Sequence, residues 1–262
     1  MKKMLRVIIG FAILFGVYHS AEYMVLFANQ PLLFLCISFL FFPIAQWIAK
    51  RQGLEGIRAF AVTVNSFHLS QGALGLLIGI TVNILMVIVL NVCNVEHIDR
   101  IPPVGAFLRA ALPLVFGTVF SSLTEDVLTR GYIFAHGHKL KPWILVLVSS
   151  IIYVLNHIHR LDEPVYLLYL FIVGIQLIIP VIVTGSIWYT LGIHWAGNIV
   201  YHLTNSVMHS SAGVNSAYAM WVAIGFMAAL IPVNYVVCRL ISASGRPYRH
   251  SSPDLRHSST LV

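Results

Sequence analysis

The chain has 262 residues, of which 58% are hydrophobic and only 10% are charged, with a mean hydropathy of +0.85 and a formal net charge of +7. Soluble domains carry about 25% charged residues, so this chain has too little charge to cover a water-exposed surface. The composition excludes soluble globular, disordered and nucleic-acid-binding proteins, and it indicates an integral, multi-pass membrane protein.

The apolar runs predict an all-α, polytopic transmembrane helical bundle, because a helix needs about 20 apolar residues to cross a bilayer. The first run follows Met1-Lys2-Lys3 and resembles a signal peptide, but no small-x-small cleavage site follows it, so we expect an uncleaved first span. About eight spans are predicted, at residues 7–26, 32–48, 73–92, 107–135, 143–157, 165–183, 187–208 and 217–238.

Two connecting regions carry further information. The 75 residues from Pro164 to Cys238 contain no Asp, Glu, Lys or Arg, which suits three spans joined by short turns at 184–186 and 210–213. Residues 50–71 place apolar side chains at three- and four-residue steps. We expect them to form a helix in the interface plane or, as an alternative, a plain cytoplasmic loop.

The distribution of Lys and Arg predicts the topology. With an even number of spans both termini lie on one side, which then carries twelve basic residues against three on the other. We therefore expect both termini in the cytoplasm. The twelve are Lys2, Lys3, Arg6, Lys50, Arg51, Arg58, Lys139, Lys141, Arg239, Arg246, Arg249 and Arg256, and the three are Arg100, Arg109 and Arg160.

Ionisable residues inside a membrane are costly and mark candidate functional sites. Glu125 and Asp126 lie in the second half of the fourth predicted span, and adjacent residues point about 100° apart on a helix. Asp126 and Arg130 are four apart and share a face, so we expect them to pair and to leave Glu125 free for chemistry. The alternative is one buried ion network without catalysis.

His157 ends the fifth predicted span, with Tyr153 one turn earlier. Glu125 and His157 lie sixteen residues either side of Lys141, in the connection between the two helices. In an antiparallel hairpin this places them at nearly equal depth, where a carboxylate and an imidazole can meet. Taken alone, His157 also suits a histidine at the membrane interface.

The seventh predicted span contains His194 and Asn198, which are four apart and share a face. This stripe suits either a wet cavity or a seam of hydrogen bonds between helices. Glu125, His157, His194 and Asn198 could together activate water for hydrolysis and hold an oxyanion. Alternatively, Glu125, His157 and His194 could bind zinc, although a His-Glu-x-x-His helix is absent.

These three segments resemble, in order, the motifs of the CAAX-processing and bacteriocin-processing (CPBP, or Abi) family of intramembrane proteases, which includes the type II CAAX prenyl endopeptidases. The first motif, a Glu-Glu pair with Arg five positions after the first Glu, is matched by residues 125–130. An aromatic residue four before a His is matched by Tyr153 and His157, and a His four before an Asn by His194 and Asn198. Asp126 replaces the usual second Glu, and Tyr153 the commoner Phe.

We expect a single transmembrane domain over residues 1–241 with a catalytic core at 107–209, followed by a cytoplasmic tail at 242–262 that is disordered because it is polar and contains Ser and His residues. The resemblance implies that Glu125 and His157 activate water, that His194 and Asn198 hold the oxyanion, and that Asp126 and Arg130 orient Glu125. Family members have been described as metalloproteases, but the resemblance favours a glutamate-dependent mechanism with no required cofactor, with zinc as the alternative.

The resulting hypothesis is an intramembrane endopeptidase that cleaves a membrane-associated or lipid-anchored peptide or protein. Its expected partners are membrane lipid and that substrate, with no nucleic acid. A non-catalytic membrane scaffold or bacteriocin-immunity-like protein on the same fold is the alternative from another class. A transporter that uses the same groups as a proton relay has less support, because the chain shows no inverted repeat.

Overall fold

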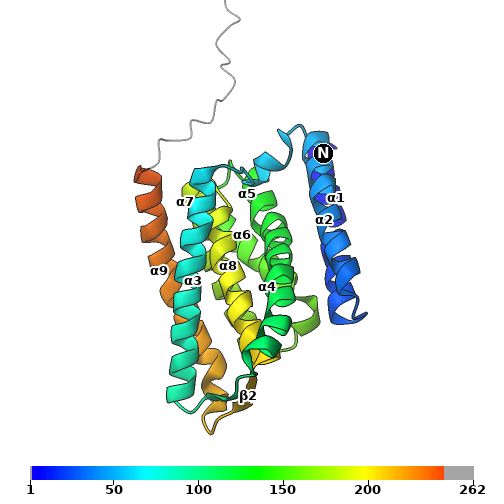
Figure 1. The fold of residues 1–262 in the computed structure, drawn as a ribbon. Coiled ribbons are helices and arrows are strands. Elements are labelled where there is room, and N and C mark those ends of the chain that lie inside the picture. The colour runs from blue at the N-terminus through cyan, green and yellow to red at the C-terminus, as the bar shows by residue number, and fades with distance from the viewer. Residues whose placement is uncertain (1, 245–262) are drawn as a thin grey trace, which may run out of the picture.

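Every apolar run predicted to span the membrane is helical in the computed structural model, which describes residues 2–244 apart from the side chains of Lys2 and His159 (Figure 1). Six helical segments within that range are long and apolar enough to cross a membrane. Five of them are the single helices α1 (Lys2–Leu26), α2 (Pro31–Arg51), α3 (Ser66–Val92), α7 (Pro164–Thr184) and α9 (Ala219–Ser244). The sixth segment begins with α4 (Val104–Asp126).

Two shorter helices, α6 (Pro142–Leu155) and α8 (Trp188–His202), complete the bundle at the positions predicted for the fifth and seventh spans. The predicted all-α membrane bundle is therefore confirmed. The last helix continues to Ser244, three residues past the boundary expected for the domain, and the rest of the predicted tail lies outside the described residues.

Two helices continue through π-helical turns, which have an i→i+5 hydrogen-bond pattern and are frequent at functional sites. The turn η2 (Val127–Gly131) joins α4 to the short helix α5 (Tyr132–His136), so that residues 104–136 form one continuous segment. The turn η4 (Leu203–Val207) extends α8 in the same way. The first of these turns contains Arg130 and directly follows Glu125 and Asp126.

The interfacial helix predicted at residues 50–71 is wrong. The chain instead forms a 3-10 helix, η1 (Gly56–Phe60), followed by a non-helical stretch up to the start of α3. Gly53 and Gly56 have φ values of +80° and +83°, a left-handed conformation that a continuous helix excludes. The loop packs inward, because Phe60 is fully buried and its ring lies 5.2 Å from that of Tyr132.

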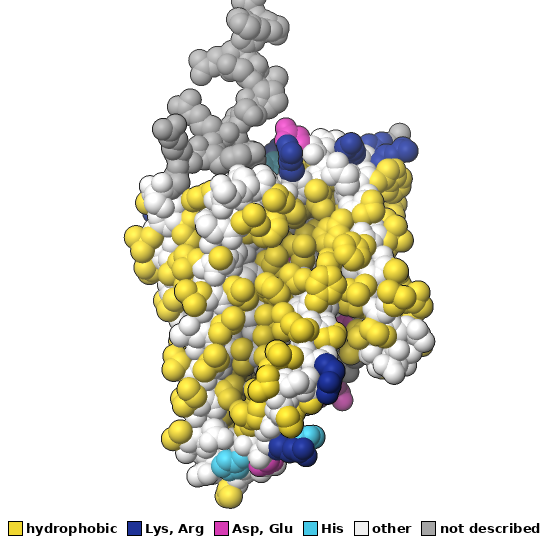
Figure 2. Space-filling view, viewed as in Figure 1, with side chains coloured by type: hydrophobic (Ala, Val, Ile, Leu, Met, Phe, Trp, Pro, Cys, Tyr) yellow, Lys and Arg dark blue, Asp and Glu magenta, His cyan; other side chains and the backbone are white. Residues whose placement is uncertain are grey.

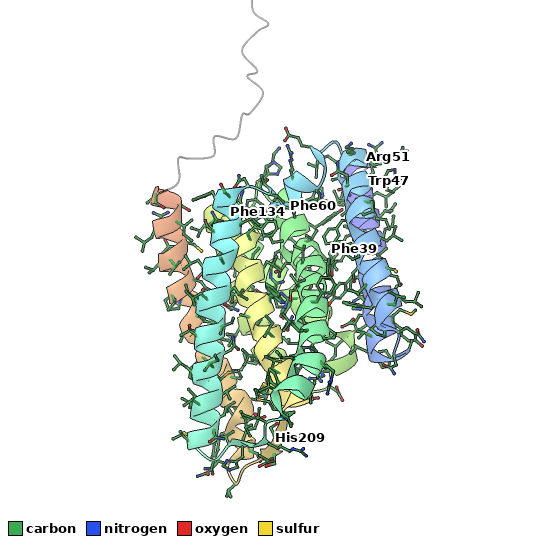
Figure 3. The ribbon with its side chains drawn as sticks, viewed as in Figure 1. Phe39, Trp47, Arg51, Phe60, Phe134 and His209 are labelled. Atoms are coloured by element: carbon green, nitrogen blue, oxygen red, sulfur yellow. The ribbon has the colours of Figure 1, made fainter. Side chains whose placement is uncertain are left out.

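A two-stranded antiparallel sheet, which was not predicted from the sequence, ties two of the connections together. β1 (Glu96–Arg100) lies between α3 and α4, and β2 (His209–Ala212) follows η4 at the second predicted turn of the charge-free segment. Glu96 pairs with Ala212, and His97 with Ser211. The sheet closes the end of the bundle opposite Trp47 and Arg51, as the position of His209 in Figure 3 shows.

The sides of the bundle are apolar and its ends are polar. In Figure 2, hydrophobic side chains cover most of the visible flank, while Lys, Arg, Asp and Glu gather mainly toward the two ends. The start of α1 and the end of α9 lie at the same end (Figure 1), as expected for an even number of crossings.

Helix α8 is held deep in the bundle by its close contact with α3. Gly192 makes the approach possible, since a Cβ there would overlap the backbone of Gly72 and Leu76. Six consecutive residues of the first half of α8 are accordingly buried, as is Ala196: Tyr189, Thr190, Leu191, Gly192, Ile193 and His194. This packing fixes His194 inside the bundle.

Candidate active site

Glu125 lies near the end of α4, where its side chain is largely enclosed and only 5% exposed. One carboxylate oxygen, Oε1, accepts a hydrogen bond from Nδ2 of Asn156 at 3.1 Å. The other, Oε2, lies 3.6 Å from Nε2 of His194 on α8. The carboxylate is therefore positioned between the end of α6 and the middle of α8.

Asp126 and Arg130 form the predicted ion pair, through Arg130 Nη1 and Asp126 Oδ1, and both side chains are fully buried. Arg130 Nη1 also donates to Oγ1 of Thr129 at 3.0 Å, and the guanidinium lies 4.5 Å from the centre of the Tyr153 ring on α6. A neighbouring carboxylate and an aromatic face together compensate for removing the guanidinium charge from water.

Asp126 also contacts the histidine of the third motif. His194 Nδ1 donates to the same Asp126 Oδ1 at 3.0 Å, since an ionised carboxylate can only accept hydrogen bonds. The Nδ1 hydrogen is thereby directed to Asp126, and Nε2 faces Glu125. Asp126 thus orients His194 directly, whereas the family resemblance implied that it orients Glu125.

Asn198 lies one turn after His194 on α8 and is partly buried. Its Nδ2 donates to Oγ of Ser122, on α4, at 2.9 Å. Ser122 precedes Glu125 by three residues and is fully buried, so this bond fixes α8 against the same part of α4 that carries the carboxylates. An amide has two N–H hydrogens, so the Ser122 bond occupies one of the two.

His157 lies at the edge of this group, just beyond the end of α6. Its Nδ1 is 2.9 Å from the carbonyl oxygen of Tyr153 and donates to it, and its ring meets the Tyr153 ring edge-on. Within residues 2–244, no hydrogen bond or ion pair links His157 to Glu125. The preceding residue, Asn156, contacts Glu125 instead. The prediction that the residue at the depth of Glu125 is His157 is therefore off by one position.

The structure thus brings the side chains of Glu125, Asp126, Arg130 and His194 together directly. Asn198 is tied to the same part of α4 by its hydrogen bond to Ser122. His157 adjoins the group through its chain neighbour Asn156, which contacts Glu125. Sequence reasoning missed both linking residues. Asn156 is 2% exposed at the end of an apolar helix, and a buried amide directly before a candidate histidine was the signal that could have identified it.

Zinc was the alternative cofactor, with Glu125, His157 and His194 as ligands. In the described part of the chain, no three His, Cys, Asp or Glu side chains are grouped so that they could hold a metal ion. Glu125, His157 and His194 are therefore not grouped as a ligand set here and do not fit a zinc ion in this arrangement.

Comparison with known protein families gives one match. Residues 107–200 match the model of the Rce1-like type II CAAX prenyl endopeptidases. The predicted resemblance is confirmed over these residues. The matched CAAX-protease segment runs from α4 into α8 and contains every residue proposed for the site, and the match points to a protease. The chain matches no curated protein and no solved structure.

Proposed function

We propose that the protein is an intramembrane endopeptidase of the CAAX-protease type in which Glu125 activates water to hydrolyse a peptide bond. The observation that carries this proposal is a pair of enclosed groups on different helices. The Glu125 carboxylate and the His194 imidazole face one another across 3.6 Å, and each is held by another polar side chain. A base and an electrophilic group in such positions can act on one substrate carbonyl.

In the proposed reaction Glu125 takes a proton from water as the oxygen attacks the carbonyl carbon of the scissile bond. The carbonyl oxygen becomes an oxyanion, which protonated His194 stabilises through Nε2–H, while Asp126 stabilises the imidazolium from Nδ1. Asn198 adds the amide hydrogen that Ser122 does not use. When the tetrahedral intermediate collapses, the C–N bond breaks and Glu125 returns the proton to the leaving amine.

We assign His157 a supporting role in proton transfer. The Tyr153 carbonyl fixes its hydrogen on Nδ1, so that Nε2 of the neutral ring can accept a proton. The residue is half-buried and adjoins the exposed turn between α6 and α7. It can therefore exchange protons between the enclosed carboxylate and solvent.

The proposed substrate is a membrane-associated or lipid-anchored peptide, because the site lies within the helical bundle and the matched family is named for prenylated CAAX peptides. We further propose that both termini are cytoplasmic. The excess of Lys and Arg on one side supports this orientation, as does the placement of both described ends at one end of the bundle.

The test is cleavage of a farnesylated C-terminal peptide by the full chain in lipid vesicles, compared with the same peptide without the lipid. Glu125→Gln keeps the size of the side chain and removes the base, so we expect the rate to fall by about 10²- to 10⁴-fold. Glu22→Gln is the matched control, since Glu22 is the other glutamate inside a span and pairs with His19 at 2.7 Å.

Equal loss in both variants would point to a general effect of removing charge from the bundle. Full cleavage by Glu125→Gln would contradict the proposed role and favour a non-catalytic scaffold or a different base. Cleavage of the lipid-free peptide alone would contradict the proposed substrate class and leave the role of Glu125 in place.

A further inference from the structure

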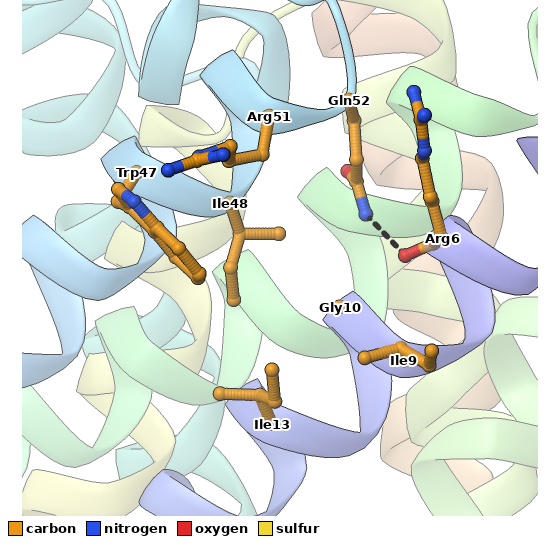
Figure 4. Close-up of a pocket in the computed structure, with 8 residues that line it drawn as sticks. All are labelled: Arg6, Ile9, Gly10, Ile13, Trp47, Ile48, Arg51 and Gln52. Carbon is orange, nitrogen blue, oxygen red and sulfur yellow. Dashed lines mark hydrogen bonds between the residues drawn. The ribbon is translucent and has the colours of Figure 1, made fainter.

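A groove with a volume of about 370 Å³ lies outside the CAAX-protease segment, between the start of α1 and the end of α2 (Figure 4). Its volume falls within the range of small-molecule sites. It is lined by two arginines, an amide, a tryptophan, a glycine and three isoleucines: Arg6, Arg51, Gln52, Trp47, Gly10, Ile9, Ile13 and Ile48.

The groove is polar at one end and apolar at the other. Arg6 and Arg51 lie on either side of Gln52 in Figure 4, and the isoleucines lie away from them along the two helices. Ile9, Ile13 and Trp47 are 49%, 39% and 52% exposed, so their apolar surface faces the surroundings of the bundle. On α1, Arg6 lies near the start of the helix, and Ile9 and Ile13 follow it further into the apolar span.

The two arginines lack a counter-charge. In the part of the chain that the structure describes, no acidic side chain forms an ion pair with Arg6 or Arg51. The Arg51 guanidinium lies 5.4 Å from the centre of the Trp47 ring, which places one face of the cation on an aromatic surface at the membrane boundary. Two cations without an ion-pair partner among the described residues can bind an external anion at this groove.

The floor of the groove is rigidly built. Gln52 Nε2 donates to the carbonyl oxygen of Arg6 at 3.0 Å and to the Tyr132 hydroxyl at 2.6 Å, and that hydroxyl donates to the Val7 carbonyl at 2.7 Å. Gly10 lets Gln52 and Ile48 pack closely against α1, because a Cβ there would collide with both side chains. The groove is therefore formed before any ligand enters.

We propose that this groove binds one anionic phospholipid, with its phosphate between Arg6 and Arg51 and an acyl chain along Ile9, Ile13 and Trp47. A phosphate can form charge-assisted hydrogen bonds with the guanidinium groups, and a hydrocarbon chain can pack against the exposed isoleucines. A soluble phosphate compound would use only the first half of the groove and leave the apolar half exposed.

The test uses quenching of tryptophan fluorescence by brominated lipids in phosphatidylcholine vesicles that hold the full chain. Brominated phosphatidylglycerol and brominated phosphatidylcholine are compared at the same minor fraction, and Trp47→Phe identifies the part of the signal that belongs to the groove. We expect the anionic lipid to quench Trp47 more strongly than the zwitterionic one.

The variant Arg6→Gln/Arg51→Gln should remove this excess. Each arginine near the membrane surface contributes about 1 kcal/mol, so the affinity for the anionic lipid should fall on the order of 30-fold. The matched control is Arg58→Gln/Arg239→Gln, which removes the same charge from two exposed positions outside the groove. It should keep the excess.

Equal quenching by the two lipids, or an excess that both double variants retain, would overturn the proposal. Inorganic phosphate tested alone in detergent separates the two sources of the anion. If it binds through Arg6 and Arg51 while phosphatidylglycerol shows no excess quenching, the site is one for a soluble anion and the lipid proposal is wrong.

Discussion

Two groups of polar side chains are buried in this apolar bundle, and they differ in charge. The proposed catalytic cluster, called the catalytic cluster below and defined as Glu125, Asp126, Arg130 and His194, brings two carboxylates, a guanidinium and an imidazole together. The α7–α9 cluster, defined as Gln176, Tyr189 and Asn234, is neutral. The Tyr189 hydroxyl donates to Asn234 Oδ1 at 3.1 Å, and Asn234 Nδ2 donates to Gln176 Oε1 at 2.8 Å.

The two clusters also differ in how completely their hydrogen bonds are formed. Around the catalytic cluster, Asp126 Oδ2, Arg130 Nε and Nη2, and Asn156 Oδ1 are buried without a hydrogen-bond partner among the described residues, whereas no side-chain atom of the α7–α9 cluster is in that condition. Buried polar atoms left unpaired are costly. The comparison teaches that the α7–α9 cluster joins helices with its hydrogen bonds complete, while the other cluster retains buried polar atoms without partners within residues 2–244.

The largest expected effect is on stability, and it tests whether the bundle needs the paired charges of the catalytic cluster in order to stay folded. Arg130→Met leaves Asp126 buried without its cation, so we expect a loss of about 3–5 kcal/mol in the free energy of unfolding, measured by denaturation in mild detergent. Asp126→Asn/Arg130→Met should recover part of that loss, because no unpaired charge remains. A double variant less stable than Arg130→Met would contradict this explanation.

The next test concerns activity, through the amide that holds Glu125. Asn156→Ala removes a hydrogen bond to a carboxylate, of about 1.5–3 kcal/mol, so kcat should fall about 10- to 100-fold with little change in KM. Cleavage of the farnesylated peptide measures it. Asn205→Ala is the control, because Asn205 is exposed and donates to its own helix at the Tyr201 carbonyl. Unchanged kcat in Asn156→Ala would remove Asn156 from the site.

The smallest effect is expected for a substitution in the α7–α9 cluster, which should lower stability and leave the cleavage rate nearly unchanged. Asn234→Ala leaves the Tyr189 hydroxyl and Gln176 without partners and should lower the free energy of unfolding by about 1–3 kcal/mol. The cleavage rate per folded molecule should stay within about twofold. A large drop in that rate with the bundle intact would show that both clusters serve the reaction.

The sequence predicted the helices well because an apolar run of bilayer length has few alternatives in a membrane. At residues 50–71 it left an interfacial helix and a loop as alternatives, and the helix is wrong because two glycines with positive φ interrupt it. The strand pairing of β1 with β2 joins residues more than a hundred positions apart, and no local pattern specifies such a contact.

Within the site, the Asp126–Arg130 pair was predictable because it depends only on helical spacing. The partner of Glu125 was displaced by one residue, from His157 to Asn156. The π-helical turn η2 lies between Glu125 and the connection to α6, so equal residue counts on the two arms do not give equal depths. The contact from Asp126 to His194 depends on the packing of α8 and could not be read from either segment alone.

The unequal lengths of α6 and α7 have a consequence for how the reaction obtains its water. Helix α6 has 14 residues and α7 has 21, so at 1.5 Å per residue they differ by about 10 Å. The chain covers that difference between residues 156 and 163 mostly without regular helix, and backbone of this kind is tolerated at membrane depth only inside protein or beside water. The exposed side chains of Arg160, Asp162 and Glu163 extend this hydrophilic path. We propose that water for the proposed hydrolysis enters along this path, from the end of the bundle opposite the one rich in Lys and Arg.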